Sequence, residues 1–238
     1  MKKLLVALLG FWSISASGQA ALLVLIFGDR VASEKFHLSL DVGLNTPILY
    51  GLDEPVFPGV HFGLGTHLRI GDQWTLTGEF KPLNTFKVKE APRITDLPSS
   101  LSSGFEKDQN AWNGNTIQVP IFVQYQLDRR WGFGSGPEFS FLSKMNQSYK
   151  ATITGSDQTV EIADDIQPFF KNVYYNWMVD INFTLYKEEK KAAIIRVRYI
   201  QGLTSIFEEG VTTQLGEPRV IQSHLGNFQL ILTIPFIE

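Results

Sequence analysis

Strict alternation of apolar and polar residues is the feature that most constrains how this chain can fold. Between residues 36 and 45 every second side chain is apolar, from Phe36 to Leu44, and each intervening position is polar or glycine. A period of two over ten residues is typical of a β-strand with two unlike faces. No segment shows helical spacing of comparable length, so the pattern predicts an all-β chain.

The same alternation recurs in eight segments of roughly ten to fourteen residues each. A tilted strand needs about 9–11 residues to cross a bilayer, whereas strands of soluble proteins have about five or six residues. The segments therefore predict eight transmembrane strands. They cover residues 36–46, 59–70, 74–84, 116–127, 131–142, 173–186, 193–203 and 225–236.

The connections between these strands alternate in length. Those at 71–73, 128–130 and 187–192 are short, and those at 47–58, 85–115, 143–172 and 204–224 are longer. Outer-membrane barrels show this asymmetry, with short periplasmic turns and long external loops. We expect a transmembrane antiparallel up-and-down β-barrel. The segment 85–115, rich in Ser, Pro, Asn and charge, is expected to be irregular, whereas 149–153 and 159–162 are expected to pair above the membrane.

Two features indicate which face of the strands meets lipid, since a soluble lipocalin-type barrel would alternate as well. The polar face carries many glycines, which suit the inside of a narrow barrel. Large aromatic side chains mark the strand ends, as they do at bilayer interfaces. The apolar face is therefore expected to contact lipid, which places the chain in the cell outer membrane. The expected aromatic girdle consists of Phe36, Trp74, Tyr125, Trp131, Trp177 and Phe236.

Charged residues on the inward face are balanced in sign. An eight-stranded barrel has an interior that side chains can fill, and buried charges must be paired. We expect an ionic network that plugs the lumen, with Asp180 opposite Arg198 across the 187–192 turn. A water-filled conduit, and hence a small-solute channel, is the alternative. The network is expected to contain Asp41, Arg69, Glu79, Lys81, Glu138, Asp180, Arg196 and Arg198.

The N-terminus has the pattern of a secretory signal peptide. Lys2 and Lys3 precede an apolar run and a stretch of small residues that ends at Ala20. The expected division is a signal peptide at 1–20, a short periplasmic segment at 21–35 that can form a helix, and the barrel domain at 36–238. The apolar run continues to Phe27, so one uncleaved membrane helix is the alternative.

Several classes of function lack support in the sequence. There is no cysteine, and the net charge of −3 gives no basic surplus for nucleic acid. His61 and His67 are about 20 Å apart along one strand, too far to share a metal, and we expect no cofactor. We also expect no enzymatic activity. An outer-membrane lipid-modifying enzyme is the less favoured alternative, with Ser223, His224 and Glu208 or Glu209 as its residues.

Three short segments stand out besides the leader: 27–36 (FGDRVASEKF), 118–121 (QVPI) and 198–204 (RYIQGLT). Together with the leader they resemble the porin-like (PorT-type) outer-membrane β-barrels of Bacteroidota, which are Gram-negative. The best-known relative belongs to a protein-secretion system, so the resemblance implies a secretion-accessory role as one possibility. Together with the plugged lumen and the long external loops, this predicts a structural, surface-interaction or secretion-accessory protein. Phe236 resembles the C-terminal aromatic that the barrel-assembly machinery reads. The partners it implies are outer-membrane lipids, that machinery and a protein of the outer membrane or of a secretion complex.

Overall fold

The computed structural model describes residues 35–50, 56–92, 94, 105–153, 159–188, 191–209, 211 and 223–236. The expected signal peptide, and all but the last residue of the expected periplasmic segment, lie outside the described residues. Among the described residues, no helix combines the length and the apolar character needed to span a membrane.

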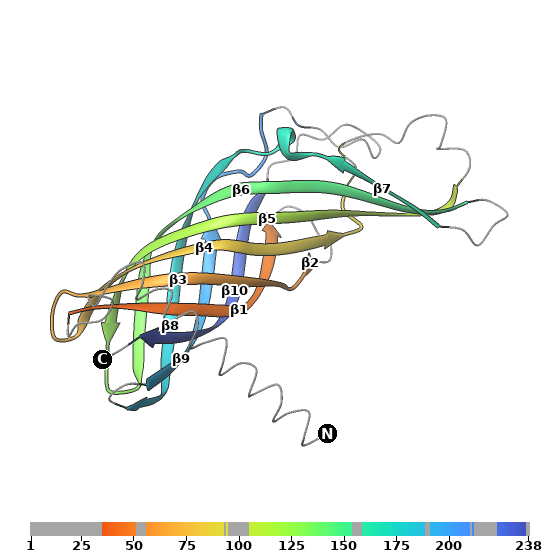
Figure 1. Cartoon of the computed structure of the whole chain (residues 1–238). Helices are drawn as coiled ribbons and strands as arrows, with labels where there is room; N and C mark the ends of the chain where they lie inside the picture. The colour runs from red at the N-terminus through yellow and green to blue at the C-terminus, as the bar shows by residue number, and fades with distance from the viewer. Residues whose placement is uncertain are drawn as a thin grey trace, which may run out of the picture.

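Eight long antiparallel strands form a closed ring (Figure 1). Each of them pairs with two neighbours, in the order β1-β3-β4-β5-β6-β8-β9-β10 and back to β1. The predicted eight-stranded up-and-down barrel is therefore confirmed. The strands are β1 (Phe36–Tyr50), β3 (Gly59–Arg69), β4 (Trp74–Lys89), β5 (Phe105–Gln126), β6 (Trp131–Ile153), β8 (Val173–Glu188), β9 (Lys191–Gly202) and β10 (His224–Phe236).

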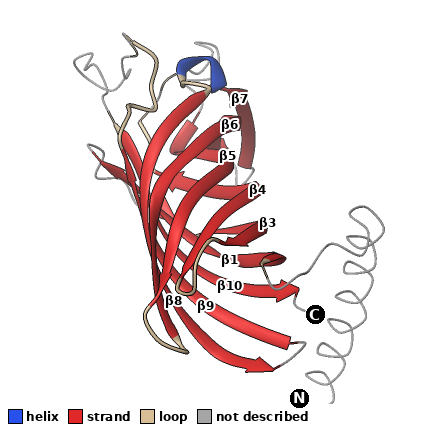
Figure 2. Ribbon diagram, turned by 90° about the vertical axis from the view of Figure 1, so that its left-hand side faces the viewer, coloured by secondary structure: helices blue, strands red, loops and turns tan. Residues whose placement is uncertain are grey.

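The strands are tilted, and short turns join them at one end of the barrel (Figure 2). Between β5 and β6, Asp128 Oδ1 accepts hydrogen bonds from the backbone N–H groups of Arg130 (2.6 Å) and Trp131 (2.7 Å). These two bonds hold the pKa of the Asp128 carboxyl below its usual range. By the rule of short periplasmic turns, this end lies in the periplasm and the opposite end is extracellular.

At the extracellular end, three strands continue beyond the ring as an open sheet, which we call the wing. The wing comprises residues 85–89 of β4, 105–115 of β5 and 143–153 of β6, together with β2 (Val56–Phe57) and β7 (Thr159–Asp165). The pairing of 149–153 with 159–162 is confirmed. The prediction of an irregular segment over 85–115 was wrong at both ends, because residues 85–89 pair with 111–115.

An apolar cluster fills the extracellular mouth of the barrel, and we call it the mouth cluster. Trp112 lies at its centre, fully buried, with its ring edge-on to Phe170 and Phe207 at centroid distances of 5.7 and 5.9 Å. The 3-10 helix Gln167–Phe169 precedes Phe170. The cluster contains Leu49, Phe86, Val88, Ala91, Ile94, Trp112, Leu142, Met145, Ile166, Phe170, Tyr174, Ile206, Phe207, Val211 and Leu225.

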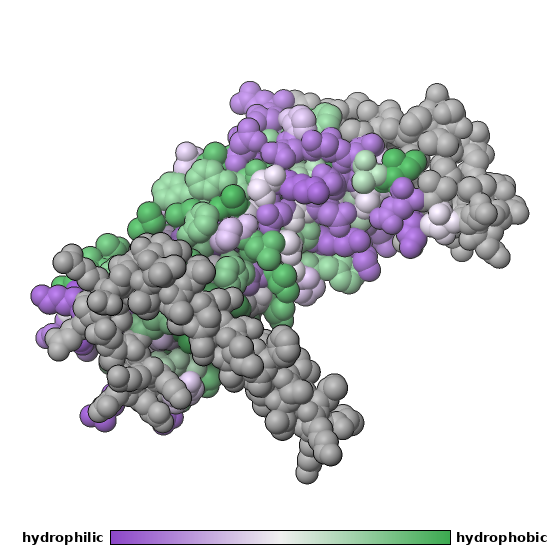
Figure 3. Space-filling view, in the orientation of Figure 1, coloured by the Kyte–Doolittle hydropathy of each residue, from purple (hydrophilic) through white to green (hydrophobic). Residues whose placement is uncertain are grey.

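Apolar side chains also cover the outside of the barrel body, and polar side chains cover the wing (Figure 3). Outward residues of the body such as Phe80, Val179 and Leu230 are 47–50% exposed although they are large and apolar. A soluble protein seldom leaves such a continuous apolar surface in water. The outward face of the body is thus the surface that meets lipid.

Candidate functional site

Glu79 of β4 is the centre of the buried ionic network. Its carboxylate lies 2.6 Å from Nη1 of Arg196, and Arg198 binds it through two nitrogens, with Nη1–Oε2 at 2.7 Å and Nη2–Oε1 at 2.8 Å. Lys81 Nζ is 3.0 Å from Glu79 Oε2. All four side chains are at most 1% exposed. A bidentate guanidinium–carboxylate contact of this kind is strong and directional.

Asp180 of β8 is the second carboxylate shared by both arginines. Asp180 pairs with Arg198 in the β8–β9 ladder, which confirms the register predicted from the turn. Arg198 Nε donates to Asp180 Oδ2 at 3.1 Å, and Arg196 Nε donates to Asp180 Oδ1 at 3.2 Å. Each guanidinium therefore bridges two carboxylates from different walls of the barrel.

Two further polar contacts extend the network toward β10. Lys81 Nζ donates to Gln229 Oε1 at 3.1 Å, and Gln229 Nε2 donates to Gln118 Oε1 at 3.0 Å. Asp41 Oδ1 accepts a hydrogen bond from Thr233 at 2.6 Å, whereas its Oδ2 is 4.0 Å from Arg196 Nη1. Asp41 is therefore at the edge of the network.

Two of the residues expected in the network stand apart from it. Glu138 is fully buried, but its Oε1 accepts hydrogen bonds from the neutral groups of Ser140 (3.2 Å) and Asn176 (3.0 Å), and from no basic side chain among the described residues. Placing Arg69 in the lumen was wrong: its side chain is exposed and donates to the Asp72 carbonyl at 3.3 Å. Arg69 ends β3 at the periplasmic rim, where its side chain reaches water.

Phe122 of β5 is an inward residue that the sequence patterns did not single out. Its ring lies 5.1 Å from the guanidinium carbon of Arg196 and 5.0 Å from that of Arg198. Gly134 makes room for the ring, since a Cβ there would lie 3.0 Å from the Phe122 Cδ2. The only signal in the sequence was its even number, which Phe122 shares with the inward Gln118.

The two inward histidines have different surroundings. His67 Nε2 is 2.9 Å from Ser39 Oγ, its Nδ1 is 3.1 Å from Thr77 Oγ1, and its ring stacks on His37. His61 is buried, and neither of its ring nitrogens has a hydrogen-bond partner within the described part of the chain. In the part of the chain that the structure describes, no group of three His, Cys, Asp or Glu side chains is placed to hold a metal ion.

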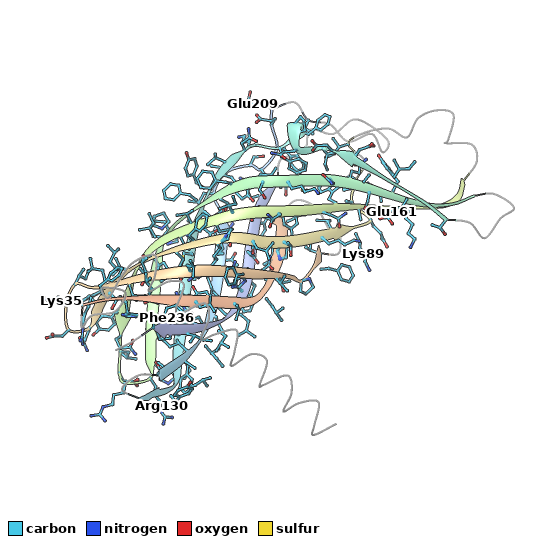
Figure 4. All side chains as sticks on the ribbon, in the orientation of Figure 1. Lys35, Lys89, Arg130, Glu161, Glu209 and Phe236 are labelled. Atoms are coloured by element: carbon cyan, nitrogen blue, oxygen red, sulfur yellow. The ribbon has the colours of Figure 1, made fainter. Side chains whose placement is uncertain are left out.

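The expected girdle residues lie at the strand ends and point outward. Trp74 and Trp131 begin β4 and β6 and are 47% and 45% exposed, and Trp177 toward the other end is 47% exposed. Trp74 packs on Tyr125 at a centroid distance of 4.8 Å. Phe36 begins β1 and Phe236 ends β10, both partly buried. Figure 4 shows Phe236, Lys35 and Arg130 at the periplasmic end, opposite Lys89 and Glu161 of the wing.

The residues of the enzyme alternative are not joined into a catalytic set. Ser223 is fully buried, and among the residues that the structure describes its hydroxyl has no hydrogen-bond partner, so it makes no hydrogen bond to His224. Glu208 and Glu209 are exposed. An activated serine needs a base within hydrogen-bond reach, and this geometry does not supply one.

Comparisons with known proteins agree with this architecture. A family model described as "Outer membrane protein beta-barrel domain" matches residues 34–208. No curated protein matches the chain.

Solved structures with a similar fold share little sequence with the chain. The attachment invasion locus protein Ail of Yersinia pestis, in complex with the heparin analogue sucrose octasulfate, is 10% identical with a TM-score of 0.44, over 86% of this chain and 100% of that chain. The outer membrane protein OprG of Pseudomonas aeruginosa is 11% identical with a TM-score of 0.43, over 87% and 98%. Neisserial surface protein A is 9% identical with a TM-score of 0.40, over 84% and 96%.

Proposed function

The chain belongs to the outer membrane protein beta-barrel domain family and is an integral protein of the outer membrane, and from this premise we propose that it acts without catalysis, through its extracellular face. In this account the barrel body is a closed anchor in the membrane. The wing and the segments around the mouth are the parts that meet other molecules. Loops and sheet extensions on a rigid scaffold are where binding usually resides.

The filled lumen is the observation that carries this proposal. At mid-depth, Glu79, Asp180, Arg196 and Arg198 connect β4, β8 and β9 through contacts of 2.6–3.2 Å. Above them the mouth cluster adds a second, apolar layer. Both layers lie across the route that a solute would take, which favours a structural, surface-interaction or secretion-accessory role.

Within the family, we propose that the chain is of the PorT type found in Bacteroidota. The support is the similarity of residues 118–121 and 198–204 to those barrels. A secretion-accessory role in that setting has two kinds of partner besides lipid. One is a protein of the outer membrane or of a secretion complex, and the other is the barrel-assembly machinery, which would read Phe236.

A small-solute channel is the second candidate, and one observation favours it. Several buried side-chain oxygens in the lumen lack a hydrogen-bond partner among the residues described by the structure: Asn84 Oδ1, Glu138 Oε2, Asn176 Oδ1 and Asn227 Oδ1. Buried oxygens of this kind are usually satisfied by water. A hydrated upper lumen would become a conduit if the ionic network opened, and steady current through planar bilayers would be its signature.

Site-specific photo-cross-linking in native outer membranes tests the proposed role. A photoreactive residue at Ala163, exposed on the outward face of the wing, is expected to capture the same protein as one at Lys150 on that face. A probe at Val179 on the lipid-facing surface is the matched control and should capture no protein. The proposal fails if the two wing positions capture nothing, or only what Val179 captures.

A further inference from the structure

The outward side chains change from apolar to polar at one height along the barrel axis, where the barrel body ends and the wing begins. The last outward side chains of the barrel body are apolar on all three strands: Leu83 of β4, Ile117 of β5 and Phe141 of β6. The next outward residues are Thr85, Asn115 and Lys144, which pair across the sheet, and Ser143 is also exposed at the register shift just before Lys144. Lipid chains end where this apolar surface ends, so the wing begins in the headgroup region.

Lysines dominate the charge of this face. Lys87, Lys89 and Lys144 are exposed, and none of the three has an ion-pair partner among the described residues. Lys87 and Lys144 are two strands apart, about 10 Å across the sheet. Asn113 and Asn115 lie between them on β5, because Asn113 pairs with Lys87 and Asn115 pairs with Lys144. The result is a flat surface of cations and amides.

Acidic residues bound this surface without neutralising it. Glu161 of β7 stands opposite Lys150, higher on the wing, and Glu90 follows Lys89 at the end of β4. Asp165 ends β7, and its carboxylate accepts a hydrogen bond from the backbone N–H of Gln167 at 2.9 Å. The basic part of the face is therefore the part next to the lipid-facing belt.

An aromatic side chain on the same face also indicates that this part of the wing lies in the headgroup region. Phe57 of β2 pairs with Lys87, is 40% exposed, and lies under Lys89 Nζ at 3.9 Å from its ring centroid. Aromatic rings and long cationic side chains together are typical of the membrane interface, where the stem stays in apolar surroundings and the charge reaches the headgroups.

We propose that the outward face of the wing, around Lys87, Lys89 and Lys144, binds the phosphorylated headgroups of outer-leaflet lipids. A lysine ammonium binds phosphate as a compact charge, and the asparagine amides add donors for the remaining oxygens. The face is continuous with the lipid belt and positive at the height of the headgroups. A lipid headgroup requires a site directly beside the lipid-facing belt, whereas a soluble anion or a protein could bind anywhere on the extracellular surface.

Mixed-lipid nanodiscs containing the full barrel test this site. The probe is lipid A with two phosphates, as a minor component in phosphatidylcholine, and native mass spectrometry counts the lipid A molecules retained. The variant K87Q/K89Q/K144Q keeps side-chain length and removes three charges. We expect the variant to retain at most about one tenth of the lipid A that the wild type retains, since lysines near an anionic surface act cumulatively.

The matched control removes three exposed charges at the other end, as R69Q/R129Q/R130Q, and should retain lipid A like the wild type. Fully dephosphorylated lipid A should not be retained preferentially by any form. The proposal is overturned if the wing variant retains as much lipid A as the wild type. It is also overturned if the control loses as much, or if removing the phosphates changes nothing. If the triple variant does not fold, Lys144→Gln alone is measured in its place, and an intermediate loss of lipid A retention is expected.

Discussion

Glu79 and Glu138 are both fully buried carboxylates of the lumen, but three basic side chains contact Glu79, whereas no described basic side chain forms an ion pair or hydrogen bond with Glu138. Lys81, Arg196 and Arg198 approach Glu79 within 2.6–3.0 Å. Glu138 accepts hydrogen bonds from neutral groups only, in the part of the chain that the structure describes. The two acids therefore differ in charge environment while sharing the same burial.

Removing the charge of Glu79 should be far more costly than removing that of Glu138. Glu79→Gln leaves Arg198 and Arg196 short of a carboxylate in a desolvated site, which costs about 3–5 kcal/mol. Glu138→Gln keeps the shape and replaces hydrogen bonds to neutral partners, which costs about 1 kcal/mol. Urea unfolding in lipid vesicles measures both free energies. Equal losses for the two variants would show that the network does not depend on Glu79.

The lipid-facing surface predicts a second pair of variants. Val179 is 47% exposed on the outward face of β8, so Val179→Arg would place a charge against lipid chains. The barrel should lose about 2–4 kcal/mol of stability if that position is near mid-membrane. We expect the compact folded barrel to migrate faster than the unfolded form on unboiled gels, and this fast band should weaken in the variant.

Ala163→Arg is the control for this charge. Ala163 is exposed on the outward face of the wing, above the apolar belt, so its replacement should leave the fast band unchanged. If Val179→Arg folds as well as Ala163→Arg, the apolar face of the barrel does not lie in a membrane.

The mouth cluster should unfold locally without the barrel. Trp112 is fully buried against the adjoining rings of Phe170 and Phe207, and its Nε1 donates to Gln147 at 3.4 Å. Trp112→Ala is expected to cost about 3–5 kcal/mol of local stability. Limited proteolysis should then cut the extracellular segments faster, while the fast band on unboiled gels remains.

Trp131→Ala, at an exposed position of the periplasmic girdle, is the control and should leave extracellular cutting unchanged. A Trp112→Ala protein that resists protease like the wild type would mean that the cluster does not hold these segments together.

The sequence predicts which strand residues face inward and that Asp180 pairs with Arg198, because both features depend on local geometry. A period of two fixes the face of every residue in a strand until the strand is interrupted. A short turn fixes the register of its two strands, which is why Asp180 opposite Arg198 followed from the residue numbers. The strand segments were found for the same reason.

Irregularities in the strands set the first limit on this reasoning. The β5–β6 register shifts at Asn115/Thr116, so the buried residues of β6 change from Leu142 to Met145, from even to odd numbers. A similar shift follows Lys81 in β4 and brings Asn84 inward. Nothing in the alternation marks such bulges. For this reason the sequence pattern predicts a loop where the structure has the polar outward face of the wing.

Contacts across the lumen set the second limit. Glu79 and Arg198 are on strands β4 and β9, which are four strands apart in either direction around the ring. Their meeting depends on the stagger and tilt of the whole barrel, which no single segment encodes. Arg69 shows the same limit. Its position in the alternation places it on the inward face of β3, but it ends that strand at the periplasmic rim, where the side chain is exposed.

Single-channel recording in planar bilayers tests the closed lumen most directly. The wild-type barrel, inserted under conditions in which an open porin gives steady current levels, is expected to be silent, because the ionic network and the mouth cluster fill its interior. Insertion is verified by the fast-migrating folded band of the recovered protein. Steady, reproducible current levels from the folded wild-type barrel would contradict the closed lumen and establish the small-solute channel in its place.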